Sequence, residues 1–121
     1  MTKVLLIALA SVGFNTAELP EETETSAAAC TATVSGPTFG FSGRMYFHYK
    51  TTCTAPVELI TLKASVTGPY TLATSLKTCS FTDTCSTMIA VTYKRGTWTW
   101  VNDTTYPAGV SMASRSVTLS Q

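Results

Sequence analysis

The stretch STMIAVTYKRGTWTWVN, residues 86–102, decides the fold that we expect for this chain. Apolar and polar residues alternate on both sides of Lys94-Arg95-Gly96, which is typical of two short strands joined by a tight turn. Trp98 and Trp100 fall on one face of the second strand. A small domain needs large side chains inside, so we expect at least one of them in the core. The alternative is an exposed aromatic platform for sugar rings.

The rest of residues 30–121 has the same character. It is dense in Thr, Val, Ser, Tyr and Ile, which favour strands, and it sustains no helical period. The clearest alternation puts Met45, Phe47, Tyr49, Thr51 and Cys53 on one face, which we expect to face the core. The ranges that we expect to form strands are 30–35, 44–53, 57–67, 70–79, 86–93, 97–101 and 110–119, with loops at 80–84 and 102–109.

Seven short strands in about 90 residues match the size of an immunoglobulin-type sandwich. The predicted fold class is therefore an all-β, immunoglobulin-like β-sandwich of about seven strands with two disulfides. A small β-barrel is the alternative, because periodicity does not show how strands pair.

Residues 1–29 have the layout of a secretory signal followed by an acidic leader. Lys3 precedes a short apolar run, residues 4–14, which is shorter than the roughly 20 residues of a membrane-spanning helix. Ala27-Ala28-Ala29 suits a cleavage site, and cleavage nearer Phe14 is the alternative. We expect residues 1–29 to be a signal peptide and leader, residues 30–121 to be one domain, and the mature protein to be secreted and free of membrane.

All four cysteines lie in the predicted domain: Cys30, Cys53, Cys79 and Cys85. An even number in a small exported domain indicates two disulfides. Four cysteines allow three connectivities, of which we favour Cys30–Cys53 and Cys79–Cys85 because each joins sequential neighbours. A zinc site is disfavoured by the lack of a C-x-x-C motif and by the presence of one histidine. We expect no metal and no cofactor.

The predicted domain is mildly basic. Residues 30–121 hold seven Lys and Arg residues and three Asp and Glu residues, a net charge of +4, against +1 for the whole chain. This charge lacks the clustered basic stripe of a nucleic-acid binder. It favours weak association with an anionic cell wall or polysaccharide.

A family resemblance adds to this interpretation. The segment YKRGTWTWV, residues 93–101, with its Gly-Thr-aromatic-Thr-apolar order, resembles the late strand of bacterial immunoglobulin-like and fibronectin-III-like domains. Together with CTAP at 53–56 and KTC at 77–79, it resembles small exported proteins of actinomycete type that have no assigned function. The resemblance implies a sandwich and brings no catalytic residues. The cysteine spacing departs from antibody domains, because both tryptophans follow the last cysteine.

The candidates for catalysis are sparse. His48, the single histidine, is interpreted as solvent-facing, because no acidic partner lies near it in sequence. The segment GFSG at 40–43 is not the G-x-S-x-G elbow. Asp83 and Asp103 are interpreted as turn residues rather than as a glycosidase pair. We therefore expect no catalytic residues and no enzyme activity. Asn102-Asp103-Thr104 fits the N-glycosylation pattern.

Two functions follow as hypotheses. The first is a monomeric extracellular binding or structural module whose partner is a cell-wall polymer, a polysaccharide or an extracellular protein, and not nucleic acid. It would bind through loops 36–43, 80–84 and 102–109 gathered at one end, or through one strand face. The residues proposed for binding are Arg44, Tyr46, His48, Lys50, Phe81 and Tyr106. The alternative is a small secreted inhibitor of a hydrolase that presents Phe81 on the Cys79–Cys85 loop.

Overall fold

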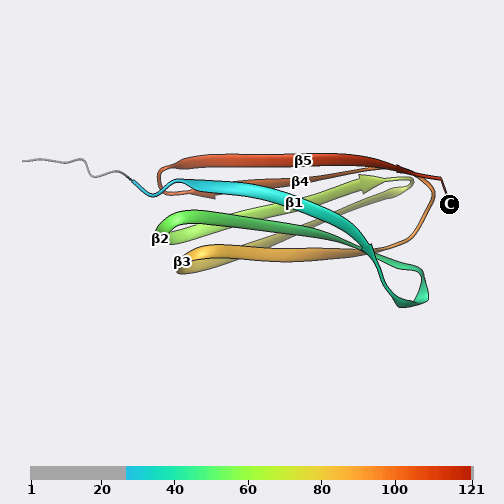
Figure 1. Ribbon diagram of the computed structural model, residues 1–121, viewed down its shortest axis with the longest axis horizontal. Coiled ribbons are helices and arrows are strands. Elements are labelled where there is room, and N and C mark those ends of the chain that lie inside the picture. The colour runs from blue at the N-terminus through green and yellow to red at the C-terminus, as the bar shows by residue number, and fades with distance from the viewer. Residues whose placement is uncertain (1–26, 121) are drawn as a thin grey trace, which may run out of the picture.

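The computed structural model describes residues 27–120, so the predicted signal peptide and most of the leader lie outside the described residues. The described chain is built of antiparallel strands, as predicted, and contains one short 3-10 turn (Figure 1). The strands form one curled sheet in the order β1-β2-β4-β5, with β3 paired to β2. The elements are β1 (Cys30–Phe39), η2 (Phe41–Gly43), β2 (Arg44–Gly68), β3 (Thr71–Thr92), β4 (Gly96–Tyr106) and β5 (Gly109–Leu119).

Five long strands replace the seven short ones expected, because two of them bend instead of ending. Thr54-Ala55-Pro56, which separates the expected strands 44–53 and 57–67, lies inside β2, where the register with β3 shifts between Thr52 and Val57. Pro56 has no backbone N–H to donate to a neighbouring strand, so the hydrogen bonding between β2 and β3 is interrupted there, and the chain does not reverse direction. The predicted loop 80–84 is likewise part of β3, and it bends alongside its partner.

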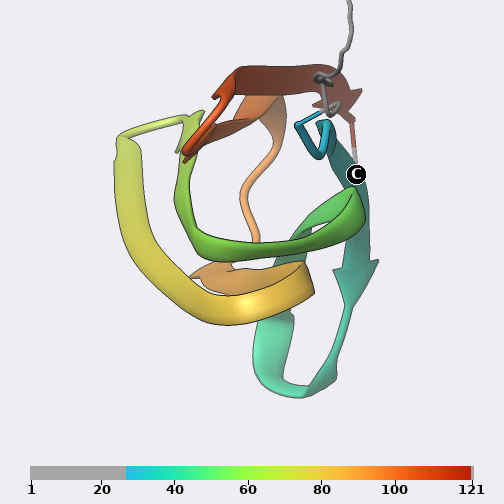
Figure 2. The ribbon, with the colours of Figure 1, turned by 90° about the vertical axis from the view of Figure 1, so that its left-hand side faces the viewer.

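The bend divides the curled sheet into two layers. The three-stranded layer contains β1, residues 44–52 of β2 and residues 84–92 of β3. The four-stranded layer contains residues 71–82 of β3, residues 57–68 of β2, β4 and β5, in that order. Figure 2 shows the strands curled around a common interior.

The turn in the deciding stretch carries the chain from one layer to the other. Before the turn, Thr92 pairs with Arg44 in the three-stranded layer; after it, Trp100 pairs with Val66 in the four-stranded layer. The two strands therefore exist as predicted but do not pair with each other. Gly96 has φ +129, and a Cβ on it would lie 2.5 Å from Pro69 Cγ, so this crossing needs a glycine.

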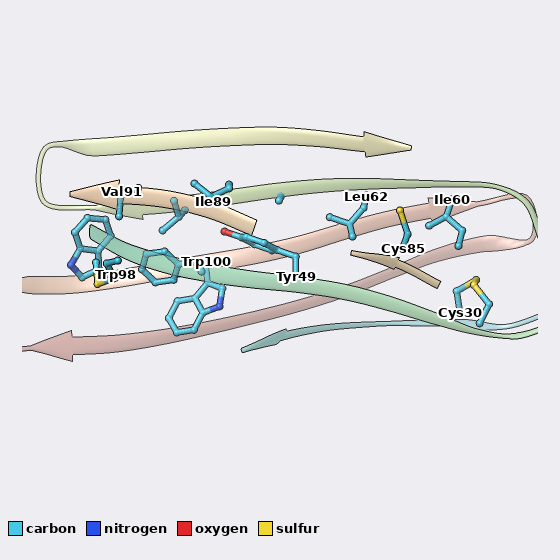
Figure 3. Packing of buried hydrophobic residues seen from close by; sticks show 14 residues of the cluster. Cys30, Tyr49, Ile60, Leu62, Cys85, Ile89, Val91, Trp98 and Trp100 are labelled. Carbon is cyan, nitrogen blue, oxygen red and sulfur yellow. A yellow bond between two sulfur atoms is a disulfide. The ribbon is translucent and has the colours of Figure 1, made fainter. Parts of the chain in front are cut away.

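The core lies between the two layers and contains the predicted faces. Trp98 and Trp100 are 0% and 1% exposed, so the exposed-platform alternative is wrong. The ring of Phe47 reaches both from the other layer, with centroid distances of 5.7 and 4.8 Å. Figure 3 shows Trp98 and Trp100 toward one end of the core, Tyr49 near its middle, and Ile60 and Cys30 toward the other end.

Polar residues also lie in the core. The predicted loop 102–109 is wrong, because residues 102–106 continue β4 and only Pro107-Ala108 turn the chain. The amide nitrogen of Asn102 donates to the Thr33 and Lys50 carbonyls of the other layer, at 3.1 Å each. Its Oδ1 accepts from Thr104 Oγ1 at 2.7 Å. The side-chain amide of Asn102 is fully buried, and these bonds satisfy its donors and its acceptor. Asn102 and Thr104 can therefore point into the core although both are polar.

Other side chains also join the two layers. Tyr49 donates its hydroxyl to the Ser65 carbonyl at 2.8 Å, and burial raises the pKa of Tyr49, so the hydroxyl stays protonated. Trp100 Nε1 donates to the Ser35 carbonyl at 3.2 Å. The edges of the sheet meet at β1 and β5, where the Ala32 amide donates to Ser111 Oγ at 3.0 Å. These bonds fix the angle at which the layers face each other.

Both predicted disulfides are confirmed. Cys30–Cys53 joins the start of β1 to the end of the first half of β2, and Cys79–Cys85 spans the bend of β3. Two disulfides in a small domain indicate an oxidising compartment. Across residues 27–120 there is no helix with the length and apolar content to cross a membrane.

Replacing Asn102 with Ala should lower the free energy of unfolding by about 3 kcal/mol, because the Thr33 and Lys50 carbonyls and the Thr104 hydroxyl lose their bonds to the amide and a small cavity forms. Urea unfolding followed by tryptophan fluorescence measures this. Thr99→Ala should change the free energy of unfolding by less than about 1 kcal/mol. It removes an outward-facing hydroxyl that is bonded to Ser116 on the neighbouring strand of the same layer. Equal losses in the two variants would contradict the cross-layer role.

Removing the Cys30–Cys53 bond by double replacement with Ala should lower stability by about 3 kcal/mol, and removing Cys79–Cys85 by about 2 kcal/mol. The difference arises because the bonds close loops of 23 and 6 residues in sequence. Guanidinium unfolding of the two double variants shows which disulfide contributes more to the free energy of unfolding. A larger loss on removing Cys79–Cys85 would contradict it.

Candidate functional site

The outer face of the three-stranded layer carries four of the six candidate residues. Arg44, Tyr46, His48 and Lys50 alternate along β2 with buried residues and so point outward, as predicted. The neighbouring strands add hydroxyl groups and one thioether beside them. The residues paired with Lys50 and His48 are Thr33 and Ser35 of β1 and Ser86 and Met88 of β3. We call this surface the basic face.

The basic face is hollowed between its strands. The hollow has a volume of about 410 Å³, and its lining includes His48, Lys50, Thr33, Ser86 and Met88. Enclosed small-molecule sites are lined mostly by apolar side chains, whereas most of the residues that line this hollow carry a hydroxyl or basic group. Such a surface suits a polar ligand that lies along the strands.

Gly36 of β1 and Gly40 of the β1–β2 connection leave room for two of these side chains. His48 Nε2 lies 2.8 Å from Thr38 Oγ1. A Cβ on Gly36, at φ +97, would lie 3.2 Å from His48 Cδ2, and one on Gly40 would lie 2.6 Å from Tyr46 Cε2. The His48 and Tyr46 rings therefore occupy space that a side chain at position 36 or 40 would fill. This packing orients the rings and leaves Arg44 and Lys50 as the exposed ends of the row.

The charge of this face has one sign. Three acidic residues lie in the described chain, and none belongs to this face. Glu58 follows the bend of β2, Asp83 lies in the bend of β3, and Asp103 lies in β4 of the four-stranded layer. The positive charges of Arg44 and Lys50 are therefore available to an anionic ligand.

Phe81 and Tyr106 do not belong to the basic face. Phe81 lies in the bend of β3, is 80% exposed and has φ +53. Its neighbours are paired, Ser80 with Leu59 and Thr82 with Val57, so it is not carried on a free loop. Tyr106 ends β4 at the turn into β5 and is half-buried. Four of the six candidate residues therefore share one face, and Phe81 and Tyr106 lie outside it.

The predicted cluster of three loops at one end is wrong. Segment 36–43 lies at the end where the Tyr93 amide donates to the Gly43 carbonyl at 2.7 Å, close to the inter-layer turn. The bend of β2 and the turn at Pro107-Ala108 meet Ala27 and Ala28 at the other end (Figure 1). The long paired strands separate segment 36–43 from the bend of β2 and from the turn at Pro107-Ala108, so the three predicted loops share no ligand.

Within residues 27–120, His48, Asp83 and Asp103 lie in three separate places. His48 is hydrogen-bonded to a threonine, Asp83 Oδ1 accepts from Thr84 Oγ1 at 3.2 Å, and Asp103 lies within β4, not in the turn expected. Within residues 27–120 no three His, Cys, Asp or Glu side chains come together as a metal site would require. Asn102, which fits the N-glycosylation pattern, is fully buried and donates to two carbonyls.

Sequence reasoning missed a second surface. A hollow of about 490 Å³ lies on the outer face of the four-stranded layer, and its lining includes Lys63, Leu76, Asp103 and Met112. These residues come from four different strands, so no local pattern groups them. The alternation of Leu72 and Leu76 is the one signal in the sequence, and period 2 alone does not say which side faces water.

No protein-family model, curated protein or solved structure matches this chain. Its function is therefore inferred from the geometry and chemistry of these two faces.

Proposed function

We propose that the domain is an exported, non-enzymatic binding module whose basic face takes an anionic extracellular polymer, such as a carboxylated or phosphorylated polysaccharide. The observation that carries this proposal is the row of Arg44, His48 and Lys50 along one strand with no described acid on the same face. Outward residues of a strand recur about every 6.8 Å, so Arg44 and Lys50 lie about 20 Å apart. That spacing suits a chain with repeated negative charges.

Tyr46 and the hydroxyl groups complement these charges. Tyr46 offers an aromatic ring and a polar end beside the cations. Thr33, Ser35 and Ser86 provide hydroxyls that both donate and accept hydrogen bonds. Charged side chains make the stronger bonds to carboxylate or phosphate oxygens, and hydroxyls fit the neutral parts of a sugar chain. The open hollow lets a polymer lie along the face.

We also propose an immunoglobulin-like or fibronectin-III-like relationship, of the exported kind suggested by residues 93–101. The pairing order supports it: β1, residues 44–52 and residues 84–92 correspond to strands A, B and E of a sandwich. Residues 57–68, β4 and β5 correspond to strands C, F and G. Residues 71–82 pair beside the strand that corresponds to C, whereas constant-type domains place a strand D beside E. The two disulfides support export.

An inhibitor of a hydrolase is the second candidate, and one observation favours it. Phe81 projects from a bend that the Cys79–Cys85 bond braces. The paired backbone on both sides of Phe81 leaves a single side chain to insert into an active site. The basic face offers more groups of one charge, so we favour polymer binding.

The oxidised protein should bind polygalacturonate, a carboxylated polysaccharide, and not neutral dextran. Raising NaCl from 50 to 500 mM should weaken the binding, because salt screens exposed charges. Lys50→Glu and Arg44→Glu should each weaken it at least tenfold, since each reverses a charge in the row. Affinity electrophoresis and titration calorimetry measure these effects.

Lys77→Glu is the matched control, because Lys77 is an exposed lysine of β3 outside the basic face. Its effect should be small. Equal weakening by Lys77→Glu, or equal binding of dextran, would show that the row has no special role.

Phe81→Ala separates the two candidates. It should leave polygalacturonate binding unchanged, because Phe81 lies outside the basic face. If the protein instead inhibits a member of a panel of proteases and amylases, and Phe81→Ala abolishes the inhibition, the second candidate replaces the first.

A further inference from the structure

One row of residues crosses the outer face of the four-stranded layer. The strand register places Leu76 beside Lys63, Lys63 beside Asp103, and Asp103 beside Met112. The row therefore reads apolar, positive, negative, apolar from one edge strand to the other. Its four residues also line the hollow of about 490 Å³. We call this surface the paired-charge face.

Apolar side chains gather on the two flanking strands of the same face. Leu72 and Leu76 of β3 and Val110 and Met112 of β5 are 64–73% exposed. The central strands, β2 and β4, contribute mainly threonine and serine, with Lys63 and Asp103 between them. Several large apolar residues exposed on one face of a small domain mark a surface that contacts another molecule.

We propose that the paired-charge face binds a second copy of this chain as an isologous dimer. The argument is charge complementarity under a two-fold axis, which brings residue i of one copy onto residue j of the other and j onto i. An axis that runs parallel to the strands, between β2 and β4, places Lys63 of each copy over Asp103 of the other. The same rotation places Leu76 over Met112. Each opposite pair is compatible, and the face needs no other partner to satisfy it.

The neighbouring rows fit the same axis. Ser65 pairs with Val101, and Thr67 pairs with Thr99, across the line between β2 and β4. Rotation places each of these residues over its own register partner in the second copy. These side chains are small or medium in size and uncharged, so they allow close approach. Lys63 and Asp103 fill the hollow, and the flanking leucines and methionines close its sides.

The size of the face sets the expected strength. Four strands about 4.8 Å apart and a run of about seven residues at 3.4 Å each give a flat area of about 450 Å² per copy, so the interface is on the order of 1,000 Å² in total. That is the low end for specific complexes. The two ion pairs then contribute more to register and specificity than to affinity. We expect a reversible dimer, in place of the monomer expected from sequence.

Charge reversal tests this arrangement in trans. The wild type should shift from monomer to dimer between about 5 µM and 1 mM in sedimentation equilibrium, as expected for a weak, reversible complex with a small interface. Lys63→Glu sets two carboxylates against each other at both symmetry-related contacts, and Asp103→Lys sets two ammonium groups against each other there. Each variant alone should dimerise at least tenfold more weakly. An equimolar mixture of the two variants should recover dimerisation. In the mixed dimer, one contact joins the two replaced residues and the other joins the original Lys63 and Asp103, so both contacts are between opposite charges.

A purely intramolecular role for Lys63 and Asp103 does not predict recovery in the mixture. Lys77→Glu, outside the row, should dimerise normally, and urea unfolding of all variants checks that each remains folded. A wild type that stays monomeric to 1 mM overturns the proposal, as does a mixture no more dimeric than its separate components. A monomeric wild type that binds an apolar peptide on this face also overturns it and assigns the face to another occupant.

Discussion

The hydrogen bonds of the Asn102 amide are the constraint on which the arrangement of the domain depends. Asn102 lies on β4, and its nitrogen reaches carbonyl oxygens of both β1 and β2 in the opposite layer. A buried amide without these partners would be strongly destabilising, so the two layers have one favourable spacing and angle. Trp100 and Tyr49 add bonds in the same direction across the core. Because the layers are fixed in this way, their outer faces are fixed as well.

Periodicity predicted the inner surface of the domain well. The alternation from Met45 to Cys53 faces the core, and the cysteines pair as expected. The predictions that failed are those that used residue composition to place turns between strands. Thr54-Ala55-Pro56 and residues 80–84 have the composition of turns, yet both lie in bends of a continuing pair of strands. A local pattern shows that pairing is interrupted and does not show whether the chain then turns back.

The same limit applies to the two candidate surfaces. The basic face was predictable because its four β2 residues lie on one strand and follow period 2. The grouping of loops failed because the end at which each loop lies depends on the topology of the whole sheet. The paired-charge face was not predictable, since Leu76, Lys63, Asp103 and Met112 come together through three separate strand registers. Asn102 was misplaced for a similar reason: its partners, at positions 33 and 50, are distant in sequence.

The position of the Cys30–Cys53 bond has a mechanical consequence. Cys30 is the first residue of β1, and its sulfur is bonded to the strand beside it. Tension applied through whatever precedes residue 30 therefore passes covalently into β2 before it loads any hydrogen bond of β1. An edge strand pulled from its end would otherwise separate one hydrogen bond at a time. With this anchor, tension from the amino-terminal side loads β1 and β2 together and does not peel β1 away from its end.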